Sequence, residues 1–129
     1  MKFMLMMHGT RKGWESMSSW TPAEFKAHIE FMMGFAAKLA AAGELVLAEG
    51  LDVPMNAKVV QSGKGGAPVI TDGPFPETTE FLAGFWIVDV PSAERAIAIA
   101  AAASAAPGPG GKPMSIPIEL RAVGAAPPV

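Results

Sequence analysis

Apolar positions along the chain follow the periods of strands and helices in turn, and they predict the secondary structure. Residues 2–8 form a short apolar run that ends at Gly9, which predicts a buried first strand before a polar loop over residues 9–20. Thr21-Pro22-Ala23-Glu24 then supplies an N-cap, a proline at the first helical position and a capping-box glutamate, so a helix begins there. Apolar residues recur on one face of this helix, which Gly43 is placed to end: Phe25, Ile29, Met32, Ala36 and Leu39.

The middle of the chain has the pattern of short strands joined by turns. Residues 44–50 predict a second strand, and residues 57–61 predict a shorter one. Ser62-Gly63-Lys64-Gly65-Gly66 is a turn sequence, from which residues 68–71 can return as the other arm of a hairpin.

The last part of the chain contains the longest strand pattern and a second helix. Residues 82–90 predict a strand that is apolar at nearly every position. Residues 92–106 predict an alanine-rich helix with a serine cap, and residues 115–123 predict a final strand. We therefore expect a single domain over residues 1–123 and a flexible tail over residues 124–129.

The order of these elements predicts the fold class. It is β-α-β, a hairpin, then β-α-β, which is typical of an α+β, ferredoxin-like βαββαβ fold with an inserted hairpin. In such a fold both helices cover one face of an antiparallel sheet. Strand 82–90 is nevertheless apolar on both faces, and the first strand places Met4 and Met6 opposite Leu5. Because a soluble monomer rarely exposes an apolar face of this size, we predict a homodimer that packs sheet to sheet.

Composition narrows the partners of this domain. The 129 residues carry a formal net charge of −2 with scattered Lys and Arg, which argues against a nucleic acid held by its phosphates. The chain has no cysteine, which excludes a thiol nucleophile and fits a cytoplasmic protein, and no His spacing indicates a transition-metal site. The longest apolar run, residues 96–106, is shorter than the roughly 20 residues of a membrane span, so we predict no membrane.

Acidic residues before the long strand are the first candidates for chemistry. Asp72 precedes Gly73-Pro74, so its side chain either closes a turn on its own backbone or acts as a general base. Glu77 and Glu80 either face solvent in the same turn or contact a ligand. Because the strand of Glu49 should run antiparallel to the long strand, Glu49 is expected near these acids at one end of the sheet. Crowded carboxylates raise one another's pKa, which suits proton transfer near neutral pH, and their oxygens suit a hard divalent cation equally.

Two histidines and a tryptophan are further candidates. His8 closes the first strand, and His28 lies at the border of the apolar stripe of the first helix. Histidine titrates near neutrality, so both are candidate catalytic residues, and a hydrogen-bonded structural role or a surface position is the alternative for each. Trp86, in the long strand, is a candidate contact for a small organic ligand.

The segment Asp72-Gly73-Pro74-Phe75-Pro76-Glu77-Thr78-Thr79-Glu80, followed by Gly84-Phe85-Trp86, resembles the signature of the YCII-related proteins of the DGPF type. The first strand, the segment 43–51 and the last strand also look like this family. The resemblance implies a dimeric α/β-barrel arrangement of the ferredoxin-like fold. It also implies a relation to proteins of which some are thought to be small enzymes that use a His–Asp pair. In many of these relatives the helical His falls about a turn later than His28, near Met32.

Two functions are compatible with these residues. The first is a small acid–base enzyme of the isomerase or lyase type, without an organic cofactor, that acts on a small organic molecule. The alternative is a non-enzymatic module that binds a ligand or a protein partner, in which the DGPF segment builds the dimer. The enzyme would use Asp72, His8 and His28 as catalytic residues and Glu49, Glu77, Glu80 and Trp86 as substrate contacts.

Overall fold

The computed structural model describes residues 1–74 and 79–128 of the chain. Its strands are β1 (Lys2–Thr10), β2 (Leu45–Gly50), β3 (Lys58–Ser62), β4 (Pro68–Asp72), β5 (Glu80–Asp89) and β6 (Ile118–Ala122). Its α-helices are α1 (Arg11–Ser16), α2 (Pro22–Ala41) and α3 (Ala93–Ser104). The predicted strands and both predicted helices are therefore present, whereas Val129 of the predicted tail lies outside the described residues.

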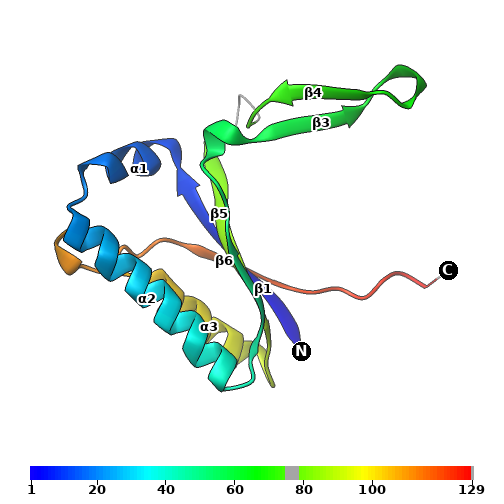
Figure 1. Cartoon of the computed structure of the whole chain (residues 1–129). Helices are drawn as coiled ribbons and strands as arrows, with labels where there is room; N and C mark the ends of the chain where they lie inside the picture. The colour runs from blue at the N-terminus through cyan, green and yellow to red at the C-terminus, as the bar shows by residue number, and fades with distance from the viewer. Residues whose placement is uncertain (75–78, 129) are drawn as a thin grey trace.

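Four strands form one antiparallel sheet in the order β2-β5-β1-β6. Helices α2 and α3 lie together on one side of this sheet, as Figure 1 shows. Because β1 and β5 are the central strands and both crossovers carry a helix on the same side, the arrangement is compatible with a ferredoxin-like α+β fold.

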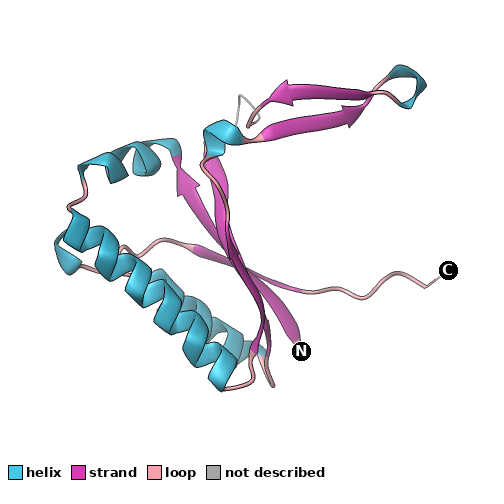
Figure 2. Ribbon diagram, viewed as in Figure 1, coloured by secondary structure: helices cyan, strands magenta, loops and turns pink. Residues whose placement is uncertain are grey.

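Strands β3 and β4 form a separate two-stranded hairpin, which we call the arm. It is the predicted inserted hairpin, and it projects away from the four-stranded sheet at the end where β5 begins (Figure 2). Val60 and Ile70 lie directly opposite each other on it, and each is 61% exposed. The arm thus carries apolar side chains that this chain leaves uncovered.

The loop predicted over residues 9–20 is instead a continuation of β1 followed by α1. The Thr10 hydroxyl accepts a hydrogen bond from the Gly13 N–H at 2.9 Å and so caps the first turn of α1. The helix lacks a repeating apolar stripe, and Gly13 within it is a poor helix former, so the pattern did not predict it. The last strand is also shorter than predicted: it begins at Ile118 because Pro117 has no N–H to give to a ladder.

The core lies between the two long helices and the face of the sheet that they cover. Alternate residues of the two central strands are turned into it, as the sequence predicted, and are almost fully buried: Phe3, Leu5, Met7, Trp86, Val88 and Val90. Leu39 from α2 and Ile99 from α3 complete this core. Cross-strand pairing then assigns the intervening residues to the other side of the sheet, which we call the open face.

The open face carries one apolar band and several charged residues. In one row of the register Met4 lies between Ile87 and Arg121, and in the next row Met6 lies between Phe85 and Glu119. On the β2 edge these rows continue to Leu47 and Glu49, which pair with Ile87 and Phe85 respectively. Leu47 is 43% exposed. Apolar residues therefore do lie on both sides of the sheet, as predicted.

The inward stripe of α2 follows the predicted one at Phe25, Met32, Ala36 and Leu39 and differs from it at one position. Ile29 was expected on the buried side but is 53% exposed. His28 and Phe35 are partly buried on the inward side in addition to the predicted residues. This correction matters for chemistry, because it places His28 within the inward stripe and not at its border.

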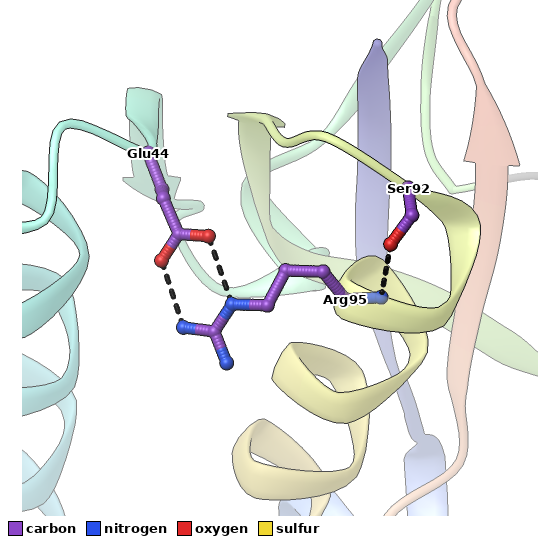
Figure 3. A network of polar contacts seen from close by, with 3 residues as sticks. All are labelled: Glu44, Ser92 and Arg95. Atoms are coloured by element: carbon purple, nitrogen blue, oxygen red, sulfur yellow. Dashed lines mark hydrogen bonds and ion pairs between the residues drawn. The ribbon is translucent and has the colours of Figure 1, made fainter.

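An ion pair joins the start of β2 to the start of α3. Glu44 accepts two hydrogen bonds from Arg95, at 2.8 Å from Nε and 2.7 Å from a terminal nitrogen (Figure 3). The Arg95 backbone N–H also donates to the Ser92 hydroxyl, which caps α3. The Arg95 side chain holds the pKa of Glu44 below its ordinary value, which favours the ionised carboxylate. The two-point contact therefore anchors the two segments, and Glu44 is not placed to donate a proton.

Candidate functional site

A hollow of about 490 Å³ lies between α2 and the β2–β5 side of the sheet, and we call it the α2 pocket. Helix α2 supplies His28, Met32 and Ala36 to its wall, and the buried side of the sheet supplies Met7 and Trp86. This volume falls in the range of roughly 300–1,000 Å³ that is usual for small-molecule sites. The pocket therefore combines an apolar wall with one titratable side chain from the helix.

His28 is held in one orientation by the loop that follows α3. Its Nδ1 lies 3.0 Å from the carbonyl oxygen of Pro107. A carbonyl oxygen only accepts hydrogen bonds, so Nδ1 carries a proton, and Nε2 is the nitrogen that can take up a further proton. Among the described residues Nε2 has no hydrogen-bond partner of its own. The Trp20 ring packs against the imidazole in a T-shaped arrangement, with ring centroids 5.6 Å apart.

The loop that holds His28 is itself fixed to the first turn of α2. One carboxylate oxygen of Glu24 accepts from the Thr21 N–H in the capping box, and the other accepts from the Gly110 N–H. These two backbone contacts lower the pKa of Glu24 from its ordinary value. At Gly108 a Cβ atom would lie 2.6 Å from the Met114 side chain, so only glycine allows this close packing. The Pro107 carbonyl is thereby positioned by contacts on both of its sides.

Gly84 allows β2 to approach β5 closely at the edge of the pocket. A Cβ atom on Gly84 would lie 2.9 Å from the backbone oxygen of Glu49, closer than real side chains come. The side chain of Glu49 alternates to the open face with its cross-strand neighbour Phe85. Glu49 is among the residues that line the α2 pocket, and by this alternation its carboxylate is directed to the side of the sheet opposite His28.

Trp86 forms part of both the core and the pocket wall. It is 5% exposed, and Phe35 packs edge-on against it with ring centroids 5.6 Å apart. Tryptophan at this position supports the fold by its buried area and is also among the residues that line the pocket. Its predicted contact with a ligand stays a prediction.

Asp72 lies at the end of β4 on the arm and not in the α2 pocket. Its side chain is 84% exposed and forms an ion pair with Lys58, its cross-strand neighbour. The hydrogen bond from Lys58 lowers the pKa of Asp72, which is the opposite of the rise that crowded carboxylates would cause. The catalytic role predicted for Asp72 stays a prediction, but the described contacts favour its ionised form.

His8 and Glu80 lie on the open face near the ends of β1 and β5. The His8 Nε2 atom is 3.0 Å from a carboxylate oxygen of Glu119 on β6, so this histidine already has an acidic partner. His8, Glu119 and Glu80 all line a hollow of about 220 Å³. The two predicted histidines therefore lie on opposite faces of the sheet and belong to different environments.

The remaining predicted acid, Glu77, lies outside the described residues. Among residues 1–74 and 79–128, no group of three or more His, Cys, Asp or Glu side chains is placed to hold a metal ion. Sequence reasoning missed two partners of its candidates: Glu119, which alternation along the last strand places on the His8 side, and the Pro107 carbonyl. A backbone oxygen in a loop leaves no sequence signal that could have identified it.

The fold and this pocket define a small α+β protein with a mostly apolar hollow beside its long helix. A family model for the YCII-related domain matches residues 1–108, and the chain belongs to this family. The chain is also 31% identical, over 80 residues, to an uncharacterized protein of Rhizobium meliloti (strain 1021). That match covers 62% of this chain and 64% of the relative. Within the described part of the chain no helix is long and apolar enough to span a membrane, and the cytoplasmic location stays a prediction.

Proposed function

We propose that this protein is a small acid–base enzyme that binds an organic molecule in the α2 pocket and moves a proton with His28. The observation that carries the proposal is the hydrogen bond from Nδ1 of His28 to the Pro107 carbonyl, beside an apolar pocket. It fixes the ring and its tautomer, and it leaves Nε2 as the proton acceptor. Catalytic histidines are commonly oriented by a hydrogen bond at the ring nitrogen that does not react, because a base must be held close to the proton that it removes.

The reaction class follows from a single base in an apolar site. Nε2 removes a proton from a carbon atom that an adjacent carbonyl group makes acidic, and His28 becomes an imidazolium. Return of that proton to a different carbon gives an isomerisation, and departure of a neighbouring leaving group gives an elimination. Neither outcome needs an organic cofactor. In this proposal His28 replaces Asp72 as the leading candidate for the catalytic base, because His28 lines the pocket.

Blocking the pocket tests the binding half of this proposal. Ala36 lines the α2 pocket, whereas Ala37 is exposed on the same helix and is not among the lining residues. We expect Ala36→Leu to weaken binding of a small aromatic ketone such as acetylnaphthalene at least about ten-fold, because its added methylenes fill the site. Ala37→Leu should bind as the parent does. Titration calorimetry measures both affinities, and equal binding by the two variants would place the ligand elsewhere.

We also propose a homodimer in the dimeric α/β-barrel arrangement, with the open faces packed together. The apolar band of Met4, Met6, Phe85 and Ile87 supports it, since these side chains are neighbours in the register and are only partly buried within one chain. Leu47 extends this patch to the β2 edge. His8 and Glu119 would lie at the margin of such an interface.

The second candidate function is a non-enzymatic one, in which the arm that leads into the DGPF segment builds an assembly. The arm favours it because a two-stranded hairpin is at best marginally stable alone in water, and Val60 and Ile70 are exposed on it. A hairpin of this kind gains stability when its apolar side chains pack on another surface.

Three single substitutions separate the two interfaces. We expect Met6→Glu, on the open face, to convert a dimer into a monomer at micromolar concentration, because it would bury a charge in the interface. Ile97→Glu is the matched control, since Ile97 is 58% exposed on α3 on the opposite side of the sheet. Ile70→Lys tests the arm. Sedimentation velocity gives the masses: loss of the dimer with Ile70→Lys alone would favour the arm, and a monomeric parent protein would refute both.

A further inference from the structure

The described residues that line the α2 pocket are mostly apolar, and two of them, His28 and Glu49, are titratable. Met7 and Met32 present thioethers, Trp86 presents an aromatic ring, and Ala36 and Ala48 leave the space between them. Of the two titratable residues, His28 comes from α2, and alternation along β2 directs the Glu49 side chain to the open face. Among the described residues that line the pocket there is no lysine or arginine.

Glu49 does not change this electrostatic character. Its cross-strand neighbour is Phe85, and Phe85 pairs on its other side with Met6, so all three side chains alternate to the open face. On the buried side of the sheet, Trp86 and Gly84 pair with Ala48 and Gly50 of β2, and both of these β2 residues are uncharged. Alternation therefore directs the Glu49 carboxylate away from the pocket. The Glu24 carboxylate, one turn before His28 on α2, is held by the N–H groups of Thr21 and Gly110.

A charged ligand in such a pocket would lose its water without gaining a partner of opposite charge. An anion has no lysine or arginine to meet among the described residues that line the pocket. A cation has no carboxylate to meet. An uncharged flat molecule loses little hydration and gains contact with the thioethers and the indole ring. It can also form a hydrogen bond with the imidazole or give up a proton to it.

We propose that the α2 pocket selects an uncharged, flat organic molecule, such as a conjugated ketone, ester or lactone, and rejects carboxylates, phosphates and amines of the same size. This inference rests on the proposed function, and it adds the chemical class of the substrate. It makes the charge of the ligand, and not a specific polar contact, the main discriminator at this site.

A size-matched series tests the inference on the full chain. Naphthalenemethanol, naphthoate and naphthylmethylamine share one aromatic body and differ in charge. We expect the alcohol to bind about ten-fold or more tightly than either ion at pH 8, measured by titration calorimetry, because an unpaired charge is costly to bury. Ala36→Leu should abolish binding of the alcohol, and the matched Ala37→Leu should preserve it.

Each outcome is decisive. Binding of naphthoate or naphthylmethylamine as tight as that of the alcohol, and lost in Ala36→Leu, would overturn the charge selection while leaving the pocket and its proposed function intact. Failure of all three molecules to bind, or binding that Ala36→Leu does not affect, would overturn the inference and the proposed function together.

Discussion

Replacement of His28 by asparagine is expected to leave the protein folded and to slow proton transfer by about 100- to 10,000-fold. The side-chain amide of asparagine occupies the place of Nδ1 and can donate to the Pro107 carbonyl, so the contact that holds the loop is kept. Nothing in asparagine replaces Nε2. The variant therefore separates the structural role of this histidine from its chemical one.

The measurement is hydrogen exchange from a carbon acid in D₂O. Acetylnaphthalene has an exchangeable methyl group beside its carbonyl, and proton NMR follows the loss of that signal with the parent protein and with His28→Asn. His8→Asn is the matched control, because His8 lies on the open face with Glu119 as its partner. Thermal unfolding of both variants shows that the fold is retained.

The alternative results are equally informative. Exchange that survives in His28→Asn but is lost in His8→Asn would move the chemistry to the open face. A folded His28→Asn variant whose loop remains attached but whose exchange rate is unchanged would make His28 a structural residue that only tethers the loop. Loss of activity in Asp72→Asn, with His28 intact, would make Asp72 of the DGPF segment the leading candidate for the catalytic base.

Local signals predicted most of the fold because most of the helices and strands can be identified from a short stretch of sequence. The capping box at Thr21 and Glu24 and the alternation through Trp86 and Val88 are examples, and both are present in the structure. Helix α1 escaped prediction because it has neither a stripe nor a buried residue. The exposure of Ile29 was not predicted because Ile29 and His28 are adjacent, and only packing decides which of them faces inward.

The candidate site was less predictable for a different reason. Residue type alone singled out His28 and Asp72 as chemical groups, but it could not say what each one contacts. Asp72 pairs with Lys58 across the arm, a consequence of hairpin register. His28 meets a backbone carbonyl from a loop far along the chain. Contacts between distant segments depend on how the elements pack, and the sequence pattern carries no direct record of them.

Replacement of Trp86 by alanine is expected to lower the free energy of unfolding by about 3–5 kcal/mol. Trp86 is 5% exposed, packs against Phe35 and lies between β1 and β2 in the central part of the sheet. Its removal leaves a cavity that the neighbouring strands cannot close. Since small domains are stable by only about 5–15 kcal/mol, the loss is a large share of the total.

Urea unfolding of the Trp86→Ala variant measures this loss, and two further variants interpret it. Trp14→Ala removes a partly exposed tryptophan outside this core and should cost much less. Trp86→Phe keeps an aromatic ring against Phe35, so it should retain most of the stability while reducing the aromatic surface that the pocket presents. A stable Trp86→Phe variant with weaker ligand binding would assign Trp86 both roles, whereas unchanged binding would restrict it to the core. If Trp86→Ala lowered the stability by less than about 1 kcal/mol, the helix–sheet packing that forms the pocket would itself be wrong.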